Sequence, residues 1–235
     1  MVGRWRRRLA GLCAALLLCS ALAGCANDEK HLTTFDAASY VSGLLDQSFK
    51  GTWTNAWLDL VDLTEGAAQD AYEAGLEEEY RRFAYQFDLQ DAALTQETRQ
   101  AALELLRQVC AQAQYALNPG VALDEKRYAV EVKARSIDLF LQVKADDLDG
   151  YTAAFQEKYA QTDPAALNDE AQAAFWSEYE NDWAMGIINL CQEKLPLLGY
   201  SEVETILVLV APDSKGNYGM GDNDFANLST LILPY

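Results

Sequence analysis

The sequence predicts an α+β fold, a helix-rich single domain in which amphipathic helices pack against a small antiparallel sheet. After residue 33, most segments repeat apolar residues at intervals of three and four, which is typical of helices. One segment, residues 128–132, alternates apolar and polar residues instead, and a β-branched run near the C-terminus is followed by turn residues. An isolated hairpin is only marginally stable, so we expect the alternating strand to pair beside it.

Two helices are predicted at the start of this domain. Thr34 can cap the first, Gly51 ends it, and Val41 and Leu45 belong to its apolar face. Thr54 then starts a short helix over residues 55–63. Both helices therefore begin at a residue whose side chain can accept a hydrogen bond from the first turn.

Two longer amphipathic helices are expected next. Thr64 caps the third, whose apolar stripe is formed by Tyr72, Leu76, Tyr80, Phe83 and Phe87. Thr95 starts the fourth, which is predicted to reach Leu117, where Asn118-Pro119-Gly120 stops it; its stripe is formed by Leu103, Leu106, Cys110, Ala113 and Leu117.

The second half of the domain contains the predicted strands. Tyr128, Val130 and Val132 form one face of a half-buried strand, and residues 137–143 are ambiguous between more strand and a short helix. Helices are predicted over residues 149–159 and 165–195. The hairpin follows, with strands at 203–210 and 218–220 joined by turn residues at 212–216; a short helix near 225 and an apolar tail at 231–233 finish the chain.

The N-terminus carries a processing signal. Four arginines precede an apolar run over residues 9–23 that is too short to span a bilayer. The run ends in Leu22-Ala23-Gly24-Cys25, which resembles the lipobox of bacterial lipoproteins. This resemblance implies cleavage between Gly24 and Cys25 and attachment of diacylglycerol to Cys25. The expected organisation is a signal peptide (1–24), a short lipidated tether (25–33) and one extracytoplasmic domain (34–235), held at the outer face of the cell membrane.

The charge of the mature chain excludes several partners. Removing residues 1–24 leaves 14 lysines and arginines against 36 aspartates and glutamates, a formal charge of −22. This balance excludes a nucleic-acid partner, which needs a basic surface. It also speaks against a polybasic attachment to anionic lipid. The negative field favours cations or basic partners.

Two cysteines remain after the signal peptide and Cys25 are set aside. Cys110 and Cys191 each lie on the apolar stripe of a predicted helix, where a free cysteine behaves as a small buried hydrophobe. Export permits a disulfide between them, but we expect both to be reduced and buried. The only histidine, His31, lies in the tether, and no cysteine–histidine spacing suits a metal.

A family resemblance starts at the first helix, in the segment Tyr40-Val41-Ser42-Gly43-Leu44-Leu45-Asp46-Gln47-Ser48-Phe49-Lys50-Gly51. This segment is similar to the opening helix of a family of uncharacterised lipoproteins from Gram-positive, clostridia-like bacteria. That family shows Tyr-Val-x-x-Leu-Leu-Asp followed by an aromatic-Lys-Gly exit, then acidic helices, a Val-x-Val strand and a final hairpin. Phe49 stands where tyrosine is commoner. The shared motifs are structural, so the resemblance implies no catalytic residue and no cofactor.

The sequence contains no recognisable catalytic set. A serine or cysteine nucleophile would need a base, and no histidine lies in the domain. Paired carboxylates could hydrolyse glycosidic bonds, and candidates are Glu77 with Glu78 and the group Asp146, Asp147 and Asp149. In so acidic a chain, a solvated surface explains these pairs better.

Two further patterns have both a structural and a functional interpretation. Residues 213–217 and 222–224 are rich in oxygen ligands, as calcium loops are, but Lys215 replaces a ligand, so hairpin and capping chemistry is favoured. Aromatic residues at helical spacing could bind a sugar or a peptide, but a hydrophobic core explains them better, because a core requires this spacing. They are Trp53 with Trp57, and Trp176 with Tyr179 and Trp183.

These observations predict a membrane-anchored extracytoplasmic lipoprotein, most simply a non-enzymatic domain that binds a ligand or supports the envelope. The alternative is an envelope hydrolase of glycan or peptide that uses paired carboxylates. Possible ligands are cationic, peptide or glycan in nature. We expect the long helix that carries Trp176, Tyr179 and Trp183 to cover the face of the strand at 128–132.

Overall fold

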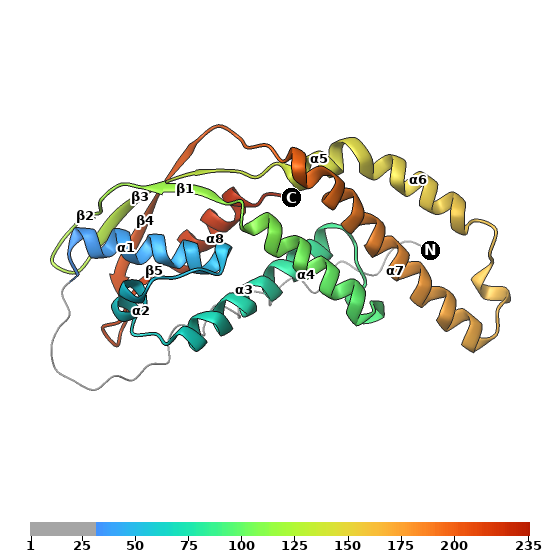
Figure 1. Ribbon diagram of the computed structural model, residues 1–235, viewed down its shortest axis with the longest axis horizontal. Helices are drawn as coiled ribbons and strands as arrows, with labels where there is room; N and C mark the ends of the chain where they lie inside the picture. Colours follow the sequence, from blue (N-terminus) through green and yellow to red (C-terminus); the bar gives the residue numbers. More distant parts are fainter. Residues whose placement is uncertain (1–31) are drawn as a thin grey trace.

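The computed structural model describes residues 32–235 and confirms the predicted α+β fold, in which helices pack against a small antiparallel sheet (Figure 1). The expected cleavage site at Gly24 and Cys25, and all of the tether up to His31, lie outside the described residues. In the part that is described, none of the helices is both long and apolar enough to cross a bilayer.

The longer helices account for most of the chain. The α-helices are α1 (Thr34–Leu45), α2 (Asn55–Val61), α3 (Glu65–Gln86), α4 (Gln96–Cys110), α5 (Leu139–Gln142), α6 (Leu148–Tyr159), α7 (Asp169–Lys194) and α8 (Asp222–Ile232). Two π-helices, η2 (Asp46–Lys50) and η4 (Val143–Asp147), extend α1 and α5, and short 3₁₀ turns lie at η3 (Asp91–Ala93), η5 (Pro164–Ala166) and η6 (Leu195–Leu197). The ambiguous residues 137–143 therefore belong mainly to a helix.

The sheet has the order β1-β3-β4-β5, and all its pairs are antiparallel. Its strands are β1 (Gln114–Leu117), β2 (Val121–Ala122), β3 (Tyr128–Arg135), β4 (Glu204–Pro212) and β5 (Tyr218–Met220). Along the central pair Val130 lies opposite Val208, so β3 pairs with the C-terminal hairpin as predicted. The short β2 adds a second partner to β3 beside β1.

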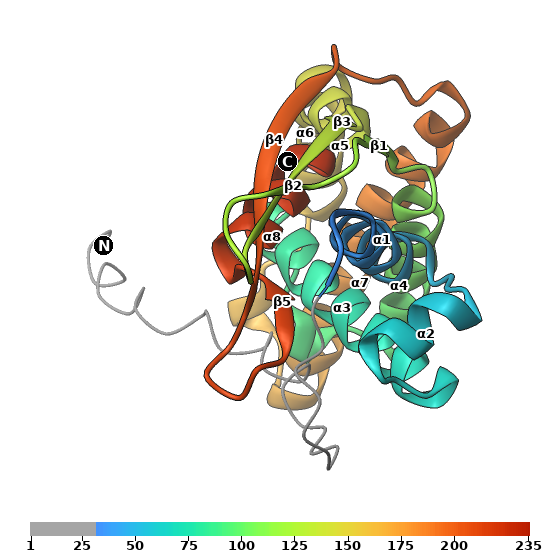
Figure 2. The same ribbon diagram turned by 90° about the vertical axis from the view of Figure 1, so that its left-hand side faces the viewer.

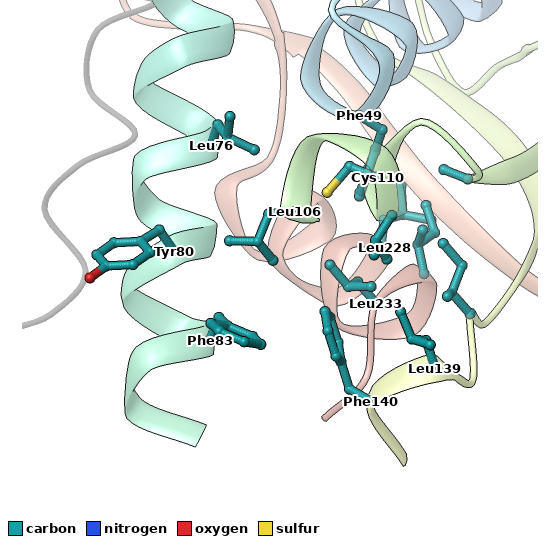
Figure 3. Close-up of a cluster of buried hydrophobic side chains, with 14 of the residues drawn as sticks. Phe49, Leu76, Tyr80, Phe83, Leu106, Cys110, Leu139, Phe140, Leu228 and Leu233 are labelled. Atoms are coloured by element: carbon teal, nitrogen blue, oxygen red, sulfur yellow. The ribbon is translucent and has the colours of Figure 1, made fainter. Parts of the chain in front are cut away.

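One hydrophobic core lies between the sheet and the helices. The inner face of β3 presents Tyr128, Val130 and Val132, all of them buried, and α1 and α8 are the helices in contact with this strand (Figure 2). The prediction that α7 covers this face is therefore wrong. Behind α1 and α8, α3 and α4 contribute Phe83 and Leu106, which complete the core with Phe140 of α5 (Figure 3).

The fourth helix is shorter than predicted. It ends at Cys110, and residues 114–117 form β1 instead of continuing the helix. Tyr115 and Leu117 are half-buried while Gln114 and Ala116 are exposed, so the segment alternates with a period of two. The apolar spacing through Leu117 predicted a longer helix. The segment forms a strand instead because it pairs with β3, which lies almost twenty positions later in the chain.

Helix starts agree with the predicted caps at Thr54, Thr64 and Thr95, whose hydroxyls accept backbone N–H groups. The first helix is different, because Thr33 and not Thr34 is its cap. Asp36 lies three residues after Thr33, and the two side chains satisfy each other's backbone N–H groups as a capping box. The long helix predicted from residue 165 begins at 169, where Asn168 caps α7.

Helices α6 and α7 form an antiparallel pair that extends away from the sheet (Figure 1). Phe155 of α6 packs edge-on against Tyr179 and Trp183 of α7, at centroid distances of 4.7 and 5.1 Å. The aromatic residues of α7 thus pack chiefly on α6 and not on the sheet. Trp176, near the start of α7, remains 45% exposed.

Candidate functional site

One surface depression is a shallow groove of about 380 Å³ between α1, η2 and β1. Helical spacing places Ser42, Asp46 and Lys50 on one face, one turn apart. Asp46 accepts hydrogen bonds from the hydroxyl of Tyr115 (2.7 Å) and from Lys50 Nζ (2.9 Å), and this ammonium group lies 4.2 Å from the centre of the Tyr115 ring. The charges in this groove neutralise each other, so it offers a ligand little.

The other residues of the Tyr40–Gly51 segment have structural roles. Trp57 packs directly on Gly43, where a Cβ atom would lie 1.9 Å from the indole ring. Gly51 ends η2 in the left-handed region, with φ of 61°, beside Tyr72. The segment that carries the family resemblance therefore serves to join α1 to its neighbours.

The second depression, which we call the aromatic pocket, has a volume of about 190 Å³ and lies between α6, α7 and the loop after α3. Three of its lining side chains are aromatic, and we call these three its floor; the other five are polar. The lining residues are Asp88, Gln90, Thr152, Phe155, Gln156, Tyr179, Glu180 and Trp183.

The floor of the aromatic pocket is held rigidly. Tyr179 and Trp183 lie four residues apart on α7 and so occupy the same helix face. The indole N–H of Trp183 donates to the carbonyl oxygen of Phe87 at 2.9 Å, which ties α7 to the end of α3. On the other side, Tyr151 packs on Trp183 at 5.2 Å. The ring positions are thus fixed before any ligand arrives.

Two carboxylates, Asp88 and Glu180, line the aromatic pocket. Asp88 follows the end of α3 and has a φ of 56°, a left-handed conformation that aspartate and asparagine tolerate better than most residues. Burial, and then the negative charge of Asp88, raise the pKa of Glu180. Among residues 32–235, neither carboxylate takes part in an ion pair with a basic side chain. A positively charged group in this pocket would meet two uncompensated carboxylates and an aromatic floor.

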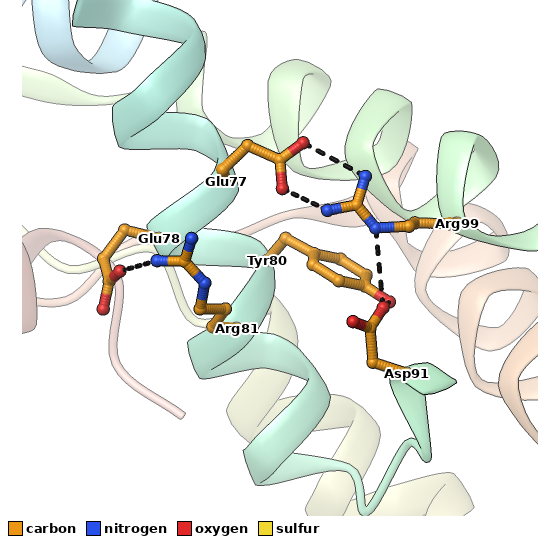
Figure 4. A network of polar contacts seen from close by, with 6 residues as sticks. All are labelled: Glu77, Glu78, Tyr80, Arg81, Asp91 and Arg99. Carbon is orange, nitrogen blue, oxygen red and sulfur yellow. Dashed lines mark hydrogen bonds and ion pairs between the residues drawn. The ribbon is translucent and has the colours of Figure 1, made fainter. Parts of the chain in front are cut away.

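The carboxylates singled out from the sequence are engaged elsewhere. Arg99 makes a two-pronged contact with Glu77, and its Nε lies 3.5 Å from Asp91, while Glu78 pairs with Arg81 on the same helix (Figure 4). Glu77 and Glu78 thus bind separate arginines and do not converge on a common site.

The second acidic group is arranged in the same way. Lys194 at the end of α7 lies 3.0 Å from both Asp146 and Asp147, and so links α7 to η4. Asp149 is exposed at the start of α6. Asp146 and Asp147 thus form ion pairs between helices and Asp149 is a surface group, which agrees with the structural interpretation favoured from the sequence.

In the two calcium-like loops, side-chain oxygen atoms accept hydrogen bonds from backbone N–H groups. Asp213 accepts the N–H groups of Lys215 (2.7 Å) and Asn217 (3.0 Å) and so closes the hairpin turn. Asp224 accepts the N–H of Leu209 at 2.8 Å. These bonds confirm the expected hairpin chemistry at Asp213. The expected helix cap is wrong, because Gly221 precedes α8 without a side-chain cap bond and Asp224 binds the backbone of β4 instead.

Cys110 and Cys191 are free and buried, as predicted. Burial raises the pKa of Cys191 to about 12 and raises the pKa of Cys110 as well. Both thiols are therefore protonated at neutral pH and behave as small apolar groups.

The sequence identified two floor residues of the aromatic pocket, Tyr179 and Trp183, but not its carboxylates. Glu180 follows Tyr179 directly, yet in a chain this acidic its position carried no signal. Asp88 joins the pocket only because the turn after α3 packs against α7. Trp176 does not line it, and Trp57 is buried against Gly43, so two of the five predicted platform residues take part.

Comparisons with known proteins give one solved structure of similar fold. It is that of YcdA from Bacillus subtilis, described as a candidate lipoprotein, with a TM-score of 0.54 and 10% sequence identity. The similarity covers 86% of this chain but only 57% of YcdA, so this chain spans little more than half of that protein. No protein-family model and no curated protein matches the chain. At this identity the similarity concerns the fold alone.

Proposed function

We propose that this protein is a lipid-anchored extracytoplasmic domain that binds a cationic group, such as a lysine or arginine side chain of an envelope peptide, in the aromatic pocket. The anchor rests on the lipobox that ends in Cys25. The similarity of fold to YcdA, itself described as a candidate lipoprotein, supports the same location.

The observation that carries the binding proposal is the pairing of two carboxylates with an aromatic floor. Aromatic faces attract cations, and the effect grows where water is partly excluded. Asp88 and Glu180 add charge at the same point. A volume of about 190 Å³ is smaller than the roughly 300–1,000 Å³ of pockets for drug-sized ligands. The pocket therefore suits one side chain better than a whole small molecule.

The anchor is tested by metabolic labelling with a fatty-acid analogue. Cys25→Ser should abolish the label, because only the thiol of Cys25 can form the thioether. Label retained in this variant would show that the lipobox has been misinterpreted.

Binding is tested by calorimetric titration of the mature protein with short oligolysine and oligoarginine peptides, and with oligoglutamate as a negative control. Glu180→Gln should weaken binding of the basic peptides at least tenfold. Asp59→Asn, which removes one exposed carboxylate from α2, is the matched control and should leave it nearly unchanged. Equal weakening by both variants would mean that only the overall negative charge attracts the peptides.

A second candidate function is the hydrolysis of envelope glycan or peptide. Asp88 and Glu180 favour it, because a carboxyl group of raised pKa beside another carboxylate is an arrangement that glycoside hydrolases use. The small size of the pocket favours binding instead. Turnover of a wall glycan that Glu180→Gln abolishes would establish the hydrolase in place of the binding domain.

A further inference from the structure

A cluster of exposed apolar side chains lies at the end of the domain where the described chain begins. Phe35 in the first turn of α1 is 73% exposed, Val121 in β2 is 63% exposed, and Leu123 just after β2 is 54% exposed. The N–H of Gly120 donates to the carbonyl oxygen of Thr34 at 3.1 Å, which brings the start of α1 beside β2. We call Phe35, Val121 and Leu123 the end patch.

The end patch continues onto the outer face of the sheet. Val121 lies opposite Ala129 of β3, which lies opposite Leu209 of β4. Leu209 is 38% exposed, and Leu207, the next residue on the same face of β4, is 67% exposed. Apolar side chains exposed singly are ordinary, but a contiguous group marks an interaction surface.

The position of the anchor identifies what this surface meets. Leu32 is held at the same end, because its carbonyl oxygen accepts the hydroxyl of Tyr128. Seven residue steps separate Leu32 from Cys25, and a fully extended chain of that length spans at most about 25 Å. A lipid on Cys25 therefore keeps this end of the domain within about 25 Å of the bilayer surface.

We propose that the end patch inserts into the bilayer interface, so that the domain stands on the membrane with the β2 end down; this rests on the proposed lipidation of Cys25. A short tether raises the effective concentration of the patch at the membrane to the millimolar range, so even weak insertion is populated. The α6–α7 pair, which contributes to the aromatic pocket, lies at the end opposite β2 and is then the part farther from the membrane (Figure 1).

Local charge decides which lipid surface suits this end. Arg127 pairs with Asp124 at 2.6 Å, and the carboxylate of Asp213 is engaged by its own turn. The charge of Arg127 is thus compensated by Asp124, so insertion depends on apolar contact and not on attraction to anionic headgroups. Insertion is accordingly insensitive to salt and occurs in zwitterionic lipid.

The test uses the mature lipidated protein in phosphatidylcholine nanodiscs that contain a nitroxide-labelled lipid. A fluorophore is attached to Leu123→Cys, or to Thr162→Cys in the loop between α6 and α7 as the control. Because Cys110 and Cys191 are buried, the introduced thiol is labelled selectively. We expect at least fivefold stronger quenching at position 123 than at 162, unchanged by salt. Equal quenching at the two positions would overturn the proposal.

A second variant separates insertion from mere proximity. Phe35→Asp combined with Val121→Asp should reduce the quenching at position 123 several-fold, and both positions are exposed, so the domain stays folded. Unreduced quenching would overturn the proposal. Intact mass distinguishes the two levels of failure: a protein without the diacylglycerol mass refutes the anchor itself, whereas a lipidated protein without quenching at position 123 refutes only the insertion.

Discussion

The sheet-bearing half of the molecule and the α6–α7 pair hold together in different ways. Around the sheet, Val130, Leu106 and Phe140 are completely buried in one cluster of aliphatic and phenylalanine side chains. Between α6 and α7 the contacts are made by aromatic rings around the buried Phe155, and the tyrosine and tryptophan rings among them stay partly exposed. The first region is built for stability, and the second keeps polar ring edges and carboxylates at the surface, where a ligand can reach them.

One acidic site in each region shows a related difference. In the sheet-bearing half, Glu79 is buried and bonded to Arg82 and to the hydroxyl of Tyr235, so each charge is compensated. In the pocket, Asp88 and Glu180 have no basic partner among residues 32–235. An uncompensated charge costs stability, which is why such groups tend to mark sites of function.

The largest expected effect is the loss of stability when a side chain of the core beside the sheet is truncated. Phe140→Ala should destabilise the protein by about 3–5 kcal/mol, because the ring is fully buried between Phe83, Phe87 and Tyr235. Phe175→Ala in the α6–α7 pair, where the ring is only half-buried, should cost about 1 kcal/mol. Urea denaturation measures both, and equal losses would contradict the difference between the regions.

The next largest loss of stability is expected at Asn181, which joins α7 to the start of α4. Asn181 of α7 accepts hydrogen bonds from the N–H of Thr95 (2.8 Å) and the buried hydroxyl of Thr98 (2.7 Å), and it donates to the carbonyl oxygen of Ala93 (3.1 Å). Asn181→Ala should cost about 1–3 kcal/mol, because it leaves these groups unsatisfied. Hydrogen exchange should show faster opening at the start of α4. Unchanged exchange there would mean that Asn181 does not join the two regions.

Replacing either of two glycines in the α6–α7 pair with alanine should change the stability of the protein in opposite directions. A Cβ atom on Gly186 would lie 1.9 Å from the hydroxyl of Tyr151, so Gly186→Ala should push α6 from α7 and cost about 1–3 kcal/mol. A Cβ atom on Gly150 would meet no other part of residues 32–235 within 4 Å, and Gly150→Ala should stabilise α6 by about 0.5–1 kcal/mol. Thermal denaturation compares them. Two effects of the same sign would refute the close contact at Gly186.

The smallest effect concerns pH. Because the pKa of Glu180 is raised in the folded state, its contribution to stability is full below its unfolded pKa near 4.5 and is lost as pH rises through the folded pKa. Glu180→Gln should therefore stabilise the protein at pH 7 but not at pH 4. Asp88→Asn, which keeps the left-handed backbone, should lower the pKa of Glu180 and flatten the wild-type pH dependence. Denaturation midpoints at several pH values check this, and a parallel pH dependence of wild type and Glu180→Gln would refute it.

Helix starts, the β3 strand and the hairpin follow from local sequence. Hydroxyl caps at Thr54, Thr64 and Thr95, and the turn closed by Asp213, need only neighbouring residues, so the sequence alone predicted them correctly. The buried cysteines were also predictable, because apolar periodicity identifies a stripe that faces a core.

Other features depended on distant parts of the chain. Residues 114–117 were predicted as helix but form β1, because they pair with the edge of β3. Likewise, α1 and α8 rather than α7 cover β3, since periodicity tells which side of a helix is apolar but not which partner it meets. The aromatic pocket also depends on long-range packing. Helical spacing identified Tyr179 and Trp183, whereas Asp88 lies beside them only because the end of α3 packs on α7. Local propensity and periodicity thus determined most of the elements, whereas long-range packing decided where α4 gives way to β1 and which carboxylates share a site.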